Sequence, residues 1–241
     1  MKPYQAILIR DCGEPMVPIP SDRVALVQPH PYQVLGAPYG DQSPYCLRSG
    51  VLAALLQAQA RLQQRQPGWK IQVFDAFRPL AVQQFMVDRT YGEQVQARGW
   101  RAEALTTVQR EAVMAEVIQF WAVPSDDPAT PPPHSTGAAL DVTLVDASGA
   151  AVNMGSPIDE VSPRSHPDHF AASSVAIEQR FHAHRTLLNQ VMAAAGFCRH
   201  PNEWWHFSLG DQLWAWQRQQ ETGRQDFLAH YGRASVDLWV Q

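Results

Sequence analysis

The sequence predicts one α+β domain in which a small antiparallel sheet is flanked by helices. The chain has 241 residues, of which 45% are hydrophobic, and this is enough to bury one sizeable core. Long segments with helical periodicity are separated by short runs rich in β-branched residues. No internal repeat or low-complexity linker divides residues 1–241, so we expect a single domain.

The helices are predicted from apolar residues that recur every three to four positions. The clearest case is Leu47–Gln66, where Leu52, Leu55 and Leu62 share one face. The dipeptide Pro67-Gly68 ends this helix. The same periodicity predicts three further helices, at Leu80–Tyr91, Glu103–Trp121 and Ser174–Ala195.

The strands are predicted from short alternating or continuous apolar runs. They are Arg23–Gln28, Trp69–Asp75, Ala139–Val145, Ala150–Asn153 and Trp205–Leu209. Residues 1–46 are mostly rich in Pro, Gly and Tyr and predict an irregular N-terminal arm. Residues 211–241 carry several tryptophans and are expected to form a mostly helical tail.

Composition excludes several classes of function. A net charge of −4 and a pI near 6.1 indicate no basic surface for nucleic acid or for an anionic membrane. The three cysteines are far apart and predict neither a disulfide framework nor a cysteine-rich zinc knuckle. The first apolar run is too short for a secretory signal, so we expect a cytoplasmic protein.

A histidine and an aspartate mark the most informative stretch. His134 follows a proline-rich approach, and Asp141 lies inside the apolar strand predicted at Ala139–Val145. An unpaired carboxylate is costly in such a strand, and a bound cation would remove that cost. Imidazole and carboxylate are both zinc ligands, and Gly137 permits the tight backbone that would bring them together. The alternative is that His134 is a surface histidine and Asp141 a hydrogen-bonded aspartate. For either residue considered alone, this alternative is the favoured interpretation.

A second segment offers the third ligand. Glu203 and His206 would point to opposite faces of a straight strand, so a bend near Pro201-Asn202 is required. His206 would then bind the metal, and Glu203 would accept a proton from water activated by zinc. The alternative is that the two tryptophans between them form a wall of the core, with Glu203 and His206 at its rim.

Arg78 stands just beyond the predicted strand Trp69–Asp75. In the functional interpretation its guanidinium faces the metal and stabilises the oxyanion that forms at an amide carbonyl, worth about 3–4 kcal/mol. The alternative is an ion pair with Asp75 at the start of a helix. The sequence contains no G-x-S-x-G, P-loop, G-x-G-x-x-G or H-E-x-x-H motif, so these common active-site patterns are excluded.

Taken together, these segments resemble the zinc D-alanyl-D-alanine dipeptidases, the vancomycin-resistance dipeptidase group, and more widely the zinc D,D-carboxypeptidases. The resemblance covers about Tyr32 to Gly210. It is carried by His134-x-x-Gly137-x-Ala139-x-Asp141, Glu203-x-Trp205-His206, Asp75-Ala76-Phe77-Arg78-Pro79, Met154-Gly155-Ser156-x-x-Asp159 and Arg164-Ser165-His166.

The resemblance implies one zinc ion per chain and a full set of site residues. These are His134, Asp141 and His206 as ligands, Glu203 as base, Arg78 as oxyanion stabiliser, and Asp159 and Tyr32 as substrate contacts. Asp159 suits the free amino group of a dipeptide. The family usually has a serine two residues before the first histidine, where this sequence has Pro132, so the preference for D-Ala-D-Ala stays open.

The expected function is zinc-dependent hydrolysis of D-Ala-D-Ala or a similar small dipeptide. One alternative is a D,D-carboxypeptidase that acts on peptidoglycan peptides and shares the same residues. A second alternative is a zinc-bearing binding module without catalysis. The sequence indicates no nucleic-acid or membrane partner and gives no oligomeric state.

Overall fold

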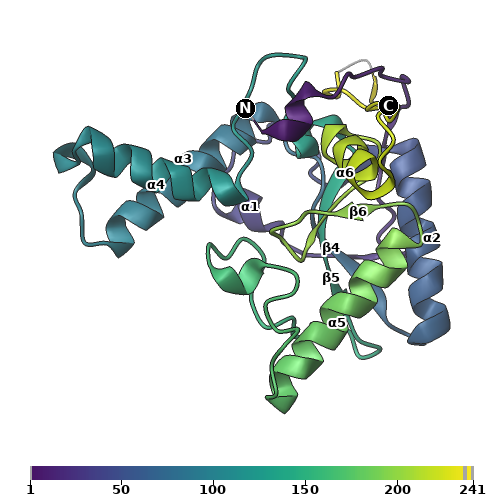
Figure 1. Ribbon diagram of the computed structural model, residues 1–241. Helices are drawn as coiled ribbons and strands as arrows, with labels where there is room; N and C mark the ends of the chain where they lie inside the picture. Colours follow the sequence, from purple (N-terminus) through teal and green to yellow (C-terminus); the bar gives the residue numbers. More distant parts are fainter. Residues whose placement is uncertain (1, 236–237, 240–241) are drawn as a thin grey trace.

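The computed structural model describes residues 2–235 and 238–239, and its centre is a five-stranded sheet (Figure 1). The strand order is β2-β4-β5-β7-β6. The strands are β2 Ala25–Leu26, β4 Lys70–Asp75, β5 Ala139–Val145, β6 Cys198–Arg199 and β7 His206–Ser208. A separate two-stranded ribbon pairs β1 Met16–Pro18 antiparallel with β3 Cys46–Arg48.

The sheet is antiparallel from β4 to β6, as the sequence predicts, but β2 runs parallel to β4. The parallel pair is explained by the long connection between β2 and β4, which includes helix α2 and leaves room for a crossover. In the centre of the sheet, Asp141 of β5 pairs with Asp75 of β4 on one side and with His206 of β7 on the other.

Helices α2 Ser49–Arg65 and α5 Ala176–Ala193 flank the sheet and share its core (Figure 1). Leu55 of α2, Leu188 of α5 and Leu140 of β5 are all fully buried in this cluster. Burying each such side chain stabilises the fold by about 1.5–3 kcal/mol relative to an exposed position. The sequence prediction of both helices is confirmed.

Helices α3 Leu80–Ala97 and α4 Thr107–Phe120 form an arm that projects from one side of the molecule (Figure 1). Thr106 begins α4 as the N-cap of a capping box with Gln109. The arm has its own apolar cluster, which ends near the sheet at Tyr32 and Trp121. Trp121 at the end of α4 and Tyr32 from the N-terminal part of the chain thus meet there, and Tyr32 also contacts Phe74 of β4.

Two sequence predictions are wrong. The strand expected at Ala150–Asn153 is only a single bridge between Val145 and Ala151. The tail is helical only in α6 Gln212–Thr222, and the residues described after it contain no α-helix. Gly223 ends α6 in a left-handed conformation (φ 71°), and the chain then returns to pair Ala229 with Ile9.

The N-terminal arm is largely irregular, as expected, with a few short elements. Besides β1 and β2, it contains the 3₁₀ helix η1 Pro3–Ala6 and the one-turn helix α1 Pro31–Val34. In Figure 1, η1 lies beside α6, so the two ends of the described chain meet. No helix among the described residues is long and apolar enough to cross a membrane.

Candidate active site

The three predicted metal ligands converge at the centre of the sheet. His134 lies in the 3₁₀ helix η3 Pro133–Thr136, Asp141 lies in β5, and His206 begins β7. One ligand atom from each residue falls within 4.8 Å of the other two, and all three side chains are buried. Because Asp141 and His206 are direct partners in the β5–β7 ladder, backbone hydrogen bonding sets their proximity.

The turn into β5 brings His134 back toward Asp141. Gly137 follows η3 with φ 70°, a backbone conformation that residues other than glycine adopt only with strain. A Cβ at this position would also lie 2.3 Å from Met16 Sδ. Before the turn, Pro132 has the extended dihedrals φ −58° and ψ 139°, as expected for the proline-rich approach.

Hydrogen bonds on the outer side of each imidazole orient the rings. His134 Nδ1 lies 2.7 Å from the carbonyl oxygen of Ala76, and this oxygen can only accept, so Nδ1 carries the proton. His206 Nε2 lies 3.4 Å from Ser208 Oγ, and this hydroxyl donates to Asp211. Both rings therefore direct their other nitrogen inward, which is the tautomer that a metal ligand needs.

The inward-facing atoms suit a zinc ion. His134 Nε2 and His206 Nδ1 lie 3.1 Å apart, and the Asp141 oxygens lie 3.3 Å and 3.0 Å from them, respectively. Lone pairs this close repel one another unless a cation stands between them. Burial disfavours the charge of Asp141, but the two histidines outweigh it and lower the pKa of Asp141. Two imidazoles and one carboxylate are a donor set of catalytic zinc sites.

Glu203 stands next to this cluster. A turn at Pro201–Asn202 precedes it, in agreement with the bend that the sequence requires. One carboxylate oxygen lies 3.9 Å from His206 Nδ1 and the other 3.6 Å from His200 Nδ1. Burial, assisted by the negative charge of Asp141, raises the pKa of Glu203 well above its usual value. A carboxylate with a raised pKa is a stronger base, as proton transfer requires.

Arg78 forms the ion pair with Asp75 and also faces the candidate metal site, so its contacts fit both interpretations of its sequence position. Its Nε donates to Asp75 at 2.9 Å, and its Nη2 reaches Asp141 at 3.2 Å. Its Nη1 donates to Gln83 at 3.0 Å. The guanidinium also lies over the Trp121 ring, 4.9 Å from its centroid. Arg78 is therefore held rigidly, with one edge of its guanidinium toward the candidate metal site.

No sequence motif marks the residues that hold Arg78 and Asp75 in place. Asp75 is fully buried and interacts with His30 Nε2 at 3.1 Å and with the Tyr39 hydroxyl at 3.0 Å. Gln83 bridges Arg78 and the carbonyl of Ala122. None of these residues belongs to a recognisable motif, and His30 lies 45 positions from its partner.

Asp159 reaches the same site from the loop after β5. It is a non-glycine residue with φ 65°, a strained conformation that concentrates at functional positions. Burial raises the pKa of Asp159 to about 7, and the charge of Asp141 adds to the shift. Tyr32 donates to Asp159 at 2.7 Å and is itself fully buried. Tyr32 thus holds Asp159 in place and is not among the residues that line the pocket of the candidate site.

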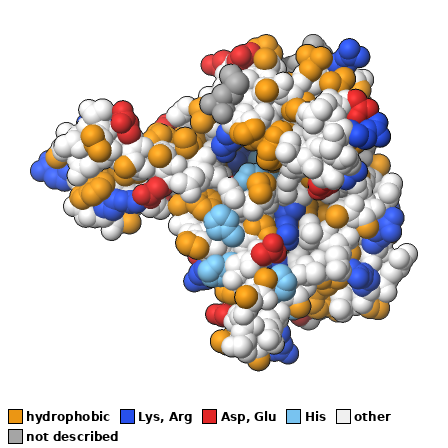
Figure 2. Space-filling view, viewed as in Figure 1, with side chains coloured by type: hydrophobic (Ala, Val, Ile, Leu, Met, Phe, Trp, Pro, Cys, Tyr) orange, Lys and Arg blue, Asp and Glu red, His pale blue; other side chains and the backbone are white. Residues whose placement is uncertain are grey.

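The pocket that contains these groups is small, with a volume of about 30 Å³. Its lining includes Lys2, Tyr4, Arg78, His134, Asp141, Asp159, His200, Glu203 and His206. Figure 2 shows several histidine side chains around a hollow near the base of the projecting helices. The pocket thus combines metal donors with carboxyl groups whose pKa values are shifted, the pattern that marks functional sites.

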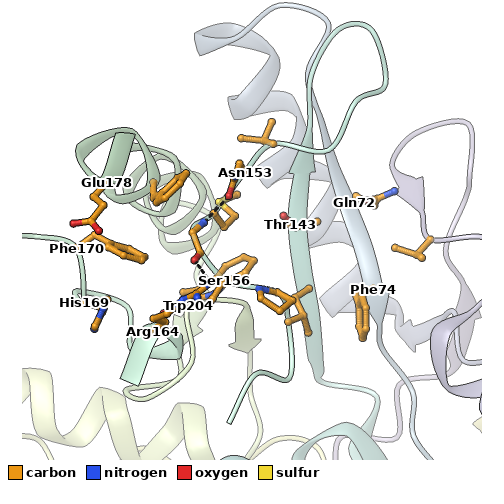
Figure 3. Close-up of a pocket in the computed structure, with 17 residues that line it drawn as sticks. Gln72, Phe74, Thr143, Asn153, Ser156, Arg164, His169, Phe170, Glu178 and Trp204 are labelled. Carbon is orange, nitrogen blue, oxygen red and sulfur yellow. Dashed lines mark hydrogen bonds between the residues drawn. The ribbon is translucent and has the colours of Figure 1, made fainter. Parts of the chain in front are cut away.

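A larger cavity of about 710 Å³ lies between the sheet and α5 (Figure 3). Gln72 and Phe74 of β4, together with Thr143 of β5, form one wall, and Glu178 of α5 stands opposite. The cavity contains none of the predicted site residues. Some of its polar groups bond one another, as in the hydrogen bond from Trp204 to Ser156. Chemistry therefore favours the smaller pocket, although size alone would select the larger cavity.

The chain is similar to several known proteins. The family described as D-Ala-D-Ala dipeptidase matches residues 26–224. A D-alanyl-D-alanine dipeptidase from Synechocystis sp. is 51% identical over 239 residues, 97% of each chain. The enzyme of the same name from Escherichia coli is 43% identical over 76 residues, 32% of this chain and 37% of the relative. The solved structure of VanYB in complex with D-alanine-D-alanine aligns with a TM-score of 0.44 and 18% identity, covering 74% of this chain and 78% of that one. By sequence, the chain belongs to the D-Ala-D-Ala dipeptidase family.

Proposed function

We propose that this protein hydrolyses D-Ala-D-Ala or a similar free dipeptide, using one zinc ion held by His134, Asp141 and His206. The observation that carries the proposal is the convergence of these three donors in one buried cluster, with Glu203 and Arg78 beside it. The substrate class is supported by the Synechocystis relative, which is named a D-alanyl-D-alanine dipeptidase.

Each side chain has a definite part in the reaction. When bound, zinc acts as a Lewis acid that lowers the pKa of water and polarises a carbonyl. His134 and His206 offer neutral imidazole nitrogens, while Asp141 offers negative charge. Glu203 accepts the proton of the attacking water and passes it to the leaving amine. Arg78 donates hydrogen bonds to the oxygen on which negative charge develops.

The two substrate contacts implied by the family have different roles in this proposal. Asp159 lines the pocket and accepts hydrogen bonds from the free ammonium group of the dipeptide. Tyr32 orients Asp159 through its hydroxyl and is therefore a positioning residue. The ammonium favours the ionised form of Asp159, against the effect of burial on its pKa.

The pocket of the candidate site is nearly closed in the absence of substrate. A volume of about 30 Å³ holds only one or two water molecules, so covering side chains must move before even a dipeptide can enter. The choice of a free dipeptide is supported by the Synechocystis relative named a D-alanyl-D-alanine dipeptidase, which is 51% identical over 97% of this chain.

The test is to assay the zinc-loaded protein against dipeptides of defined stereochemistry, N-acetylated D-Ala-D-Ala and a pentapeptide ending in D-Ala-D-Ala. We expect hydrolysis of the free D,D-dipeptide. Replacement of Glu203 (Glu203→Gln) should lower kcat by about 10²–10⁴-fold with the zinc content unchanged. Faster cleavage of the pentapeptide would instead indicate a carboxypeptidase. A zinc-loaded protein inactive on every substrate would indicate a binding module.

A further inference from the structure

Lys2 lines the candidate active site, although it is remote from every catalytic motif in the sequence. The 3₁₀ helix η1 that follows it packs against α6. Gln212 of α6 donates to the carbonyl of Ile7 at 2.7 Å, and Tyr4 of η1 is buried beside the same pocket. These contacts hold the N-terminal segment over the site, so the placement of Lys2 follows from packing in the tertiary structure.

Lys2 and Arg78 are the lysine and the arginine that line this pocket, and only Lys2 is uncommitted. The guanidinium of Arg78 already bonds Asp75, Gln83 and Asp141. The backbone N–H of Lys2 donates to Gln5, but its ammonium forms no ion pair or hydrogen bond with any residue that the structure describes. A half-buried ammonium without a partner in a pocket has donors available for an anionic ligand.

The position of Lys2 relative to Glu203 indicates which part of a dipeptide it meets. Lys2 and Glu203 line the same small pocket, and the negative charge of Glu203 opposes the lowering of the Lys2 pKa that burial causes. In the proposed reaction, Glu203 gives a proton to the leaving amine. In a dipeptide that amine is separated from the C-terminal carboxylate by only one carbon atom. The carboxylate is therefore expected on the Glu203 side of the site, whereas Asp159 takes the ammonium at the other end.

We propose that the ammonium of Lys2 binds the free C-terminal carboxylate of the dipeptide. This inference rests on the proposed function and deepens it, because Lys2 and Asp159 together recognise the two charged ends of one small substrate. A longer peptide with its amino end blocked satisfies Lys2 but not Asp159, and a dipeptide amide satisfies Asp159 but not Lys2. Lys2 is thus a specificity-determining residue.

The flexibility of lysine suits this role in such a small pocket. The four-carbon stem of Lys2 can swing aside when substrate enters, which enlarges the 30 Å³ volume, and its ammonium can then close on the carboxylate.

The test compares D-Ala-D-Ala with D-Ala-D-Ala amide in three variants: Lys2→Ala, Lys2→Arg and Lys70→Ala. Lys70 is the second of the two lysines in the chain, and its ammonium donates to the Asp22 carbonyl, remote from the site. We expect Lys2→Ala to raise KM for the free dipeptide by about 10- to 100-fold. The amide should show little change in KM. Lys2→Arg should restore most of the affinity, and Lys70→Ala should match the parent on both substrates.

Binding provides a readout that does not depend on turnover. In zinc-loaded Glu203→Gln protein, calorimetry should show that adding Lys2→Ala weakens binding of D-Ala-D-Ala but leaves that of the amide unchanged. Equal losses on both ligands, or no loss on either, would overturn the role of Lys2. Failure of the parent to hydrolyse any dipeptide would instead overturn the proposed function. Thermal unfolding of Lys2→Ala should match the parent, because the side chain forms no hydrogen bond within the described fold.

Discussion

Arg78 Nη2 lies 3.2 Å from Asp141 Oδ2, so the proposed oxyanion donor is paired directly with a proposed zinc ligand. Both side chains are buried, with 5% and 2% of their surfaces exposed. Removing one partner of a buried pair leaves an uncompensated charge, which typically destabilises a protein by about 3–5 kcal/mol. Tests of Arg78 therefore need a substitution that retains the positive charge.

The first prediction concerns Arg78→Lys. Lysine keeps the charge but lacks the planar fork that bonds Asp75, Gln83 and Asp141 at once. We expect kcat to fall by about 10²–10³-fold with little change in KM, because a lysine that is not held by these contacts donates poorly to the oxyanion, whose charge develops mainly in the transition state. Steady-state kinetics and metal analysis measure both effects. Arg89→Lys, in an exposed pair with Glu93 on α3, is the matched control and should leave kcat unchanged.

The second prediction concerns metal binding by Asp141. In the parent protein, zinc at 100 to 1,000 times its dissociation constant should stabilise the folded state by about 3–4 kcal/mol. Asp141→Asn keeps the shape of the side chain but removes its charge, so thermal unfolding should show little or no gain on adding zinc. Asp146→Asn changes an exposed carboxylate in the turn after β5 and should retain the full gain. Equal stabilisation of the Asp141 and Asp146 variants would contradict the assignment.

The third prediction concerns pH and Asp211. This carboxylate caps α6 by accepting the Trp214 N–H at 2.8 Å, and it also accepts from Ser208. Burial raises the pKa of Asp211 to about 6, from 3.8 in the unfolded chain, although these hydrogen bonds oppose the shift. The folded state therefore binds more protons between about pH 4 and 6. The contribution of Asp211 to the free energy of unfolding is complete below pH 4 and is lost as the pH rises through 6.

The contribution of Asp211 to the free energy of unfolding that is lost amounts to about 3 kcal/mol, at about 1.4 kcal/mol per pKa unit. Asp211→Asn retains an N-cap residue but does not titrate. Urea unfolding of the metal-free parent and of Asp211→Asn should be compared at pH 4, 5, 6 and 7. The stability of the parent relative to the variant should fall steadily across this range. A constant difference would show that Asp211 is charged throughout.

The fourth prediction concerns Gly137, which turns the chain between His134 and β5. Alanine there is strained by φ 70°, and its Cβ would collide with Met16, because it would lie only 2.3 Å from Met16 Sδ. The strain alone costs about 1–2 kcal/mol, and the collision adds to it. Gly149→Ala has a similar φ of 84° with no atom within 4 Å, so it measures strain without collision.

Urea unfolding should therefore show a larger loss of stability for Gly137→Ala than for Gly149→Ala. Zinc affinity should fall only in Gly137→Ala, since a shift of this turn displaces His134. If both variants lose the same stability and retain full affinity, the turn does not control the site.

Local sequence patterns are sufficient to select the residues that the structure brings together as the proposed ligands and the proposed base. His134 and Asp141 lie on one turn-and-strand unit, and the bend before His206 is marked by Pro201-Asn202. Proline fixes the backbone and glycine permits turns that other residues adopt only with strain, so such patterns can be interpreted without knowledge of the fold. Arg78 is predicted for the same reason, because Pro79 follows it at the end of a strand.

The supporting residues cannot be predicted, because their partners are distant in sequence. His30 meets Asp75 across 45 positions, and Lys2 lines the same pocket as Glu203, the proposed base, which lies at the other end of the sequence. The prediction for the tail is wrong because its tryptophans suggest a helical face, although Gly223 is a typical helix stop. Trp239 instead stacks edge-on against Phe77, 5.0 Å between ring centroids, as part of a separate apolar cluster.

The pairing of β5 with both of its neighbours has a consequence for how the metal site forms. Asp141 is aligned with His206 by the ladder on one side, and the strand on its other side leads to Arg78. The backbone hydrogen bonds that hold these residues in place thus do not depend on the metal ion. Small zinc-binding modules collapse without their metal, but this protein should persist as an ordered apo form. The apo protein would then become active by binding one zinc ion at a site that is already formed. Reversible loss of zinc would inactivate the enzyme without leading to its degradation.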